Sequence, residues 1–153
     1  MVSRIQALSK EEQADNDNVY DMIEEAQDKY KIPLEFGHFI GLVGLFPPSR
    51  NIIKNWDTNE DVFIRLVKEQ GKDGKDHFLQ ALVLYFIRKY NDQCSKFAPT
   101  FMKKLVDENI LKEKFLIDWF DKNIRLDKDS GLYDKKAEKK FRDLVEKFID
   151  WLR

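Results

Sequence analysis

Two phrases near the end of the chain share one pattern and decide its fold class: Ile117-Asp118-Trp119-Phe120 and Ile149-Asp150-Trp151-Leu152. A phenylalanine precedes each phrase, at Phe115 and Phe148. In both windows the apolar residues recur with the spacing of one face of an amphipathic helix. Aromatic helices that carry carboxylates between their rings predict a helical repeat fold whose end meets a partner. They do not indicate an active site.

The rest of the chain also predicts helices, because it contains only 6 glycines and 4 prolines and has no alternating β-branched segments bounded by turns. Pro33 is predicted as the first residue of one helix, and Ser49 as the cap of another. The predicted helices cover approximately residues 19–30, 33–46, 50–56, 58–70, 75–90, 99–106, 112–123 and 134–153.

Helices of this length with short connections predict an all-α domain of antiparallel helical pairs, a HEAT-like α-solenoid. A compact orthogonal bundle is the alternative. The helix over 75–90 is apolar on most of its surface and is therefore predicted to be central. Residues 1–18 are polar and predict a partly flexible N-terminal segment, whereas residues 19–153 predict a single helical domain.

Charge is balanced overall and uneven along the chain. The 27 basic and 28 acidic residues leave a net charge of −1, whereas nucleic-acid-binding domains are usually clearly basic. Residues 1–29 hold 3 basic and 8 acidic residues, and residues 95–153 hold 15 basic and 12 acidic residues. The balance predicts no direct nucleic-acid partner.

Cys94 is the only cysteine, so neither an intrachain disulfide nor a cysteine zinc cluster can form, which favours a reducing compartment. The N-terminus lacks an apolar signal segment, and this argues against secretion. The longest apolar stretch, Phe39 to Pro48, is too short to span a bilayer. We expect a soluble cytoplasmic protein with no membrane partner.

The candidate catalytic residues lack the neighbours that chemistry requires. His38 and His77 stand apart from any motif with metal-ligand or general-base spacing. The glycine-containing stretch 71–75 lacks the spacing of a phosphate-binding loop, and Cys94 has no histidine partner in the sequence. The sequence predicts no enzymatic activity, no cofactor and no metal site.

Trp119 and Trp151 are expected to be mainly core residues, because large aromatic side chains in amphipathic helices are usually buried. Asp118 and Asp150 lie beside them and are expected to project into solvent. If the two tryptophan helices are adjacent, their acids form a negative surface on a rigid aromatic base, which suits a lysine-rich segment. The alternative is a solvated face of salt bridges with the interleaved lysines.

The tail resembles a known family at these residues. Ile117-Asp118-Trp119 and the stretch 146–152 are similar to the two aromatic/acidic boxes of the C-terminal, two-tryptophan HEAT-like domain of translation initiation factors. That family includes eukaryotic initiation factor 5, the epsilon subunit of the guanine-nucleotide exchange factor for initiation factor 2, and the large scaffold factor of cap binding. Residues 106–113 resemble the segment that leads into the first box, and residues 23–27 and 31–34 resemble the opening helices of the factor 5 version. The boxes then lie near 107–123 and 143–152.

The resemblance implies an adaptor of translation initiation of the factor 5 type. Its implied partners are lysine-rich boxes of the beta subunit of initiation factor 2, the c subunit of initiation factor 3, and initiation factor 1. The implied binding acids, with Trp119 and Trp151 as a packed base beneath them, are Asp107, Glu108, Glu113, Asp118, Asp121, Glu146 and Asp150. The family's first box is usually rich in glutamate, whereas Lys112-Glu113-Lys114 alternates in sign, which predicts weaker binding or a narrower surface.

Two other functions fit the same residues. One is the exchange-factor epsilon domain, which supports GDP release from initiation factor 2. The other is a general helical scaffold that binds acidic or helical partners through its lysines.

Overall fold

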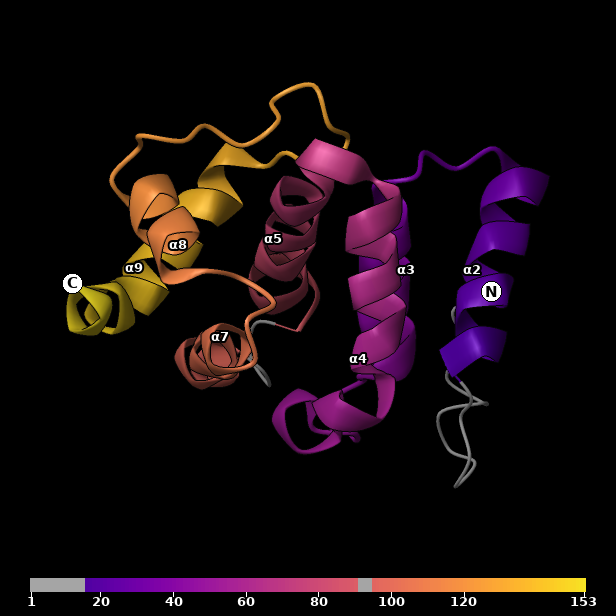
Figure 1. The fold of residues 1–153 in the computed structure, drawn as a ribbon, viewed down its shortest axis with the longest axis horizontal. Helices are drawn as coiled ribbons and strands as arrows, with labels where there is room; N and C mark the ends of the chain where they lie inside the picture. The colour runs from indigo at the N-terminus through magenta and orange to yellow at the C-terminus, as the bar shows by residue number, and fades with distance from the viewer. Residues whose placement is uncertain (1–15, 91–94) are drawn as a thin grey trace.

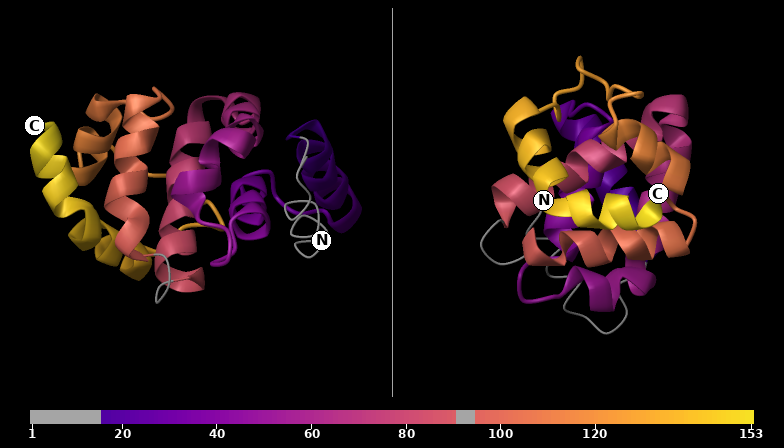
Figure 2. Two further views of the ribbon diagram at one scale, coloured as in Figure 1. Left: turned by 90° about the horizontal axis from the view of Figure 1, so that it is seen from below. Right: turned by 90° about the vertical axis from the view of Figure 1, so that its left-hand side faces the viewer.

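The computed structural model describes residues 16–90 and 95–153, and within these ranges it is helical and contains no β-strand. α2 (Asn16–Tyr30) lies at one end of the long axis, and α8 (Glu113–Phe120) lies beside α9 (Lys135–Leu152) at the other end (Figures 1 and 2). The predicted all-α, HEAT-like fold is confirmed. Residues 1–15, which make up most of the predicted N-terminal segment, and Cys94 lie outside the described residues.

α2 already includes Asn16, before the predicted start at residue 19, and α3 (Phe36–Leu45) follows it across a turn. Pro33, predicted as the first residue of the second helix, lies in this turn instead. The reason is a side chain of α2: Gln27 Nε2 donates hydrogen bonds to the carbonyl oxygens of Pro33 and Leu34, at 3.3 and 3.0 Å. These two carbonyl groups are therefore held in the turn by Gln27, and the helix starts after them.

α4 (Ile52–Glu69) is one continuous helix, where two separate segments were predicted. The predicted cap, Ser49, is also wrong, because the side chain of Asn51 accepts from the backbone N–H groups of Ile53 and Lys54. The predicted gap between residues 56 and 58 lies close to Asn59. Asn59 is buried, and its Oδ1 accepts a hydrogen bond from Arg50 at 3.0 Å.

A tight turn joins α4 to α5 (Gly74–Leu84) through the 3₁₀ turn η1 (Gly71–Asp73). A Cβ atom at Gly74 would lie 2.2 Å from the carbonyl oxygen of Val67. Only glycine fits such an approach. Gly74 therefore serves helix packing, whereas Gly71 adopts a left-handed backbone conformation with φ of 67° and has no atom within 4 Å of its Cβ position.

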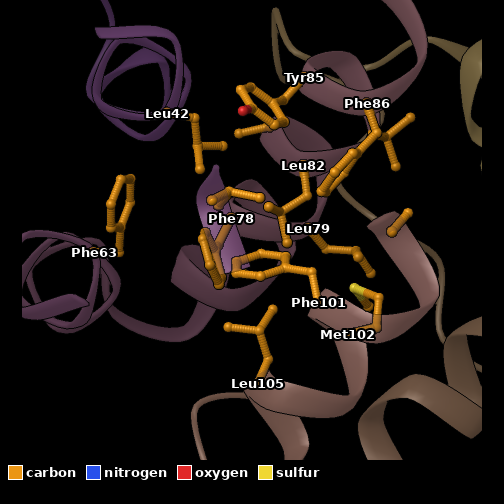
Figure 3. Close-up of a cluster of buried hydrophobic side chains, with 14 of the residues drawn as sticks. Leu42, Phe63, Phe78, Leu79, Leu82, Tyr85, Phe86, Phe101, Met102 and Leu105 are labelled. Atoms are coloured by element: carbon orange, nitrogen blue, oxygen red, sulfur yellow. The ribbon is translucent and has the colours of Figure 1, made fainter. Parts of the chain in front are cut away.

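α5 is the central helix, as predicted, and it continues into the π-helical turn η2 (Tyr85–Lys89). It packs against α3, α4 and α9. In the core, Phe78 and Leu82 of α5 and Phe86 of η2 gather near Phe101 of the next helix (Figure 3). The core thus joins the N-terminal helices to the C-terminal ones.

The C-terminal part consists of η3 (Ser95–Phe97), α7 (Ala98–Asp107), α8 and α9. Pro99 lies in the first turn of α7, as predicted. α8 ends at Phe120, before the predicted residue 123, and Lys122 adopts a left-handed backbone conformation with φ of 65°. α9 starts as predicted after Asp134, whose side chain accepts from the N–H of Ala137 at 3.0 Å. α9 packs against both α7 and α8.

Candidate functional site

The two tryptophan helices are adjacent, which was the condition for a shared acidic surface, but their tryptophans differ in exposure. Trp119 on α8 is 0% exposed, whereas Trp151 on α9 is 64% exposed. The expectation that both rings form a packed base is therefore wrong for Trp151. α7 and α8 both pack against α9, but most of the Trp151 ring remains in solvent.

Trp119 belongs to a closed polar network between α8 and α9. Its Nε1 donates to Glu138 Oε1 at 3.0 Å, and Arg142 Nη2 donates to the same oxygen at 2.9 Å. Arg142 also donates to the carbonyl oxygen of Trp119 at 3.1 Å, and its guanidinium lies 5.1 Å from the Trp119 ring centroid. The side chains of Glu138 and Arg142 are only 14% and 19% exposed. This network fastens the two helices together.

Trp151 forms the first of two cation sites at the exposed end. Its ring stacks on Phe148, with centroids 6.1 Å apart, and Lys103 Nζ of α7 lies 5.6 Å from its centroid. The same Nζ lies 2.8 Å from Asp107 Oδ2. We call this the Trp151 site: the Trp151 ring, the Asp107 carboxylate and the ammonium of Lys103 between them.

The second cation site lies where the end of α8 meets the end of α9. Arg153 forms an ion pair with Asp121, and its Nε lies 3.9 Å from Asp150 Oδ1. Its guanidinium carbon lies 5.9 Å from the ring centroid of Phe120. We call this the Phe120 site, made of Phe120, Asp121 and Asp150. The two sites together form the end face, and each already holds a cation from the chain itself.

The other predicted acids do not join the end face through any contact within the described residues. Asp118 Oδ2 lies 2.6 Å from Lys114 Nζ, in the salt bridge that the alternative interpretation expected. The hydrogen bond from Lys114 lowers the pKa of the Asp118 carboxyl. Glu113 and Glu146 are exposed and have no ion pair within the described ranges. The acids therefore divide into separate groups.

Glu108 belongs to a different cluster, between α7 and α4. Its carboxylate gathers with those of Asp57 and Glu60, with ligand atoms within 4.8 Å of one another. Lys104 Nζ lies 3.1 Å from Glu108 and 3.2 Å from Asp57, so a lysine supplies the positive charge. The pKa of Asp57 is lowered by its hydrogen bonds with Glu108 and Lys104, whereas burial raises the pKa of Glu60.

Lys103, Arg153 and Phe120 are the residues of the end face that sequence reasoning missed. The spacing of Lys103 and Asp107 on one helix is a readable signal for their ion pair. The placement of Lys103 over the Trp151 ring has no such signal, because it depends on how α7 packs against α9.

The comparisons with known proteins point to one family. The family model described as "W2: eIF4-gamma/eIF5/eIF2-epsilon" matches residues 74–153, more than half of the chain. The match contains α7, α8 and α9, and thus the whole end face. No curated protein and no solved structure matched the chain. None of the described helices is both long and apolar enough to cross a membrane.

W2 domains are protein-interaction domains of translation initiation factors that bind other translation factors, and they are not a catalytic family. The adaptor class inferred from the aromatic/acidic phrases agrees with this description. The chain belongs to the W2 domain family.

Proposed function

We propose that this chain is an adaptor of translation initiation whose end face binds a lysine-rich segment of another initiation factor. The observation that carries the proposal is the pair of cation sites. In each of them an aromatic ring and at least one carboxylate surround a positive charge that the chain supplies itself. A partner's lysine offers the same chemistry.

The physical basis is the combination of ring and carboxylate. A cation over an aromatic face gains about 0.5–1 kcal/mol at an exposed site, and the lysine stem covers apolar surface at the same time. Exposed ion pairs add only about 0–1 kcal/mol each, so useful affinity requires several lysines to bind together. Trp151 is the strongest single candidate for the contact, because its ring is 64% exposed.

The partners of this proposal are those that the family resemblance implies. The first is the beta subunit of initiation factor 2, through its lysine-rich boxes. The c subunit of initiation factor 3 and initiation factor 1 are further partners that the same resemblance implies. Recognition of a lysine-rich segment agrees with three acids of the end face, Asp107, Asp121 and Asp150.

The proposal is tested by titrating the chain with a labelled lysine-rich peptide and measuring fluorescence anisotropy. Asp121→Lys combined with Asp150→Lys replaces both carboxylates of the Phe120 site with like charges. We expect this variant to lower the affinity by more than about tenfold, because like charges placed opposite each other cost several kcal/mol.

A matched control has the same change in net charge elsewhere. Asp21→Lys combined with Asp61→Lys alters two exposed acids on α2 and α4. We expect this control to keep most of the affinity. If both variants lose the same amount of affinity, only net charge matters. If the Asp121/Asp150 variant keeps its affinity and its helical circular dichroism, the end face is not the binding surface.

A further inference from the structure

The first half of α9 carries a second charged surface, which the adaptor role just proposed does not use. Four exposed lysines lie within its first two turns: Lys135, Lys136, Lys139 and Lys140. We call them the α9 lysine face. No carboxylate within residues 16–90 or 95–153 pairs with any of them. By contrast Lys103, Lys104 and Lys114 each pair with an acid four residues further along the chain.

Two of the acids near the α9 lysine face, Asp134 and Glu138, are engaged elsewhere. Asp134 accepts two hydrogen bonds from Arg88, at 2.9 and 3.3 Å, and also caps the helix. Glu138 points inward to Trp119 and Arg142. Neither carboxylate is therefore free to neutralise the lysines.

Helix electrostatics makes this arrangement unfavourable. The N-terminal end of a helix carries a partial positive charge, so cations in the first turns are disfavoured. Like charges three or four residues apart are also destabilising, and the four lysines contain two pairs with a spacing of four. One spacing is favourable, from Lys139 to the exposed Asp143 four residues later, although no ion pair joins the two within the described residues. The stability of α9 otherwise gives no reason for this run of lysines, whereas a bound anionic partner does.

We infer that the α9 lysine face docks an acidic peptide segment of a partner protein. The two ends of α9 then serve two partners of opposite charge. Lys135 and Trp151 are about 24 Å apart along the helix axis, at 1.5 Å of rise per residue. The inference goes beyond the proposed binding of lysine-rich segments, because it concerns a different surface and a partner of the opposite charge.

An acidic peptide fits this surface better than a nucleic acid does. Further along the same helix the exposed residues include the acids Asp143, Glu146 and Asp150, so the positive surface is short. A uniformly charged phosphate backbone would run from the lysines onto these acids. The net charge of −1 also lacks the basic excess typical of nucleic-acid-binding domains.

The test is a titration of the full chain with a labelled glutamate-rich peptide, measured by fluorescence anisotropy at low ionic strength. Lys136→Glu combined with Lys139→Glu reverses half of the face. We expect this variant to bind the peptide more than about tenfold more weakly, because charge reversal places like charges together.

The same variant has a second readout that separates binding from folding. Each substitution puts a negative charge near the N-terminal end of α9 and four residues from a remaining lysine, Lys140 or Lys135. These gains outnumber the one like-charge spacing that the change at Lys139 creates, with Asp143. The melting temperature is therefore expected to stay the same or to rise. A loss of peptide binding together with equal or higher stability supports the inference.

The control variant, Lys54→Glu with Lys72→Glu, changes the net charge equally at two exposed lysines of α4 and η1. Equal weakening in the control overturns the inference, and so does unchanged binding in the Lys136/Lys139 variant. Labelled oligouridine is measured in parallel. Tighter binding of oligouridine than of the peptide, lost on reversal of Lys136 and Lys139, would assign the surface to nucleic acid and would also overturn it.

Discussion

Trp119 and Trp151 occupy the same place in the same four-residue phrase, yet one ring is 0% exposed and the other 64% exposed. Trp119 is enclosed because α9 packs against α8 and supplies Glu138 and Arg142 to the ring. Trp151 stacks on Phe148 of its own helix and lies beside Lys103 of α7. The phrase specifies a helix with an aromatic position, and the position of that helix in the stack decides whether the ring holds the fold or faces a partner.

The largest expected difference between the two tryptophans is in stability. Trp119→Ala is expected to lower the free energy of unfolding by about 3–5 kcal/mol, because it removes a fully buried aromatic ring. Trp151→Ala is expected to change it by less than about 1 kcal/mol, since most of that ring is already in water. Urea denaturation followed by circular dichroism measures both values, and similar losses would contradict the contrast.

The network around Trp119 gives the next largest effect. Glu138→Ala leaves Arg142 and the Trp119 Nε1 group without their shared acceptor, and we expect a loss of about 2 kcal/mol of unfolding free energy. Glu146→Ala is the control, because Glu146 is an exposed acid of the same helix. If the two variants unfold at the same urea concentration, the network does not fasten α8 to α9.

For the binding of a lysine-rich peptide, we expect the exposed ring of Trp151 to matter more than the buried ring of Trp119. Trp151→Ala is expected to lower the affinity for the peptide by about fivefold, which corresponds to the ~1 kcal/mol of an exposed cation–π contact. Trp151→Phe is expected to recover part of the affinity because it keeps an aromatic face. Isothermal titration calorimetry compares the three proteins, and full affinity in the alanine variant would remove Trp151 from the binding surface.

A smaller effect is expected from Lys103, which occupies the Trp151 site in the free chain. Lys103→Met keeps the apolar stem and removes the ammonium, so the ring and Asp107 become available to a peptide lysine. We expect the affinity to increase by about threefold, in line with the modest energy of exposed ion pairs. Lys96→Met is a control on an exposed lysine of η3. Weaker peptide binding in the Lys103 variant would show that this lysine assists the partner.

The smallest expected effect concerns Asp118, which precedes the buried tryptophan. Its folded-state pKa is lowered by the hydrogen bond from Lys114. A lowered pKa means that the pair contributes stability above the unfolded-state pKa and loses it as the pH falls through the folded value. Carboxyl chemical shifts in an NMR titration are expected to show the Asp118 pKa returning upward in Lys114→Gln. An unchanged value would assign the shift to another cause.

Much of the fold was predictable because the signals are local. The apolar faces of α5 and α9, Pro99 in the first turn of α7, and the turn before Gly74 all follow from short stretches of sequence. The start of α3 and the continuity of α4 were not predictable, because they depend on side chains distant in the sequence. Gln27 holds the turn around Pro33, and Asn59 is buried beside Arg50.

The end face was predicted only in part for the same reason. Asp121 and Asp150, two of the implied binding acids, both lie beside Arg153, whereas Asp118, the acid of the first phrase, pairs with Lys114. Glu108 was grouped with them, but its neighbours are Asp57 and Glu60 of α4, which no spacing in the sequence connects to it. Glu138 and Arg142 resemble an ordinary surface pair by their spacing, and only the packing of α8 on α9 buries them.

The length of α8 has a consequence for how this end of the molecule folds. With 8 residues it is shorter than the ~12–15 residues that an isolated helix needs to be even marginally stable in water. α8 is therefore ordered by its attachment to α9 through Trp119, and the two helices are expected to open and close as one cooperative unit. Amide hydrogen exchange should then give α8 the protection of α9, although its own hydrogen bonds are few. A binding surface that spans both helices exists only while that unit is closed.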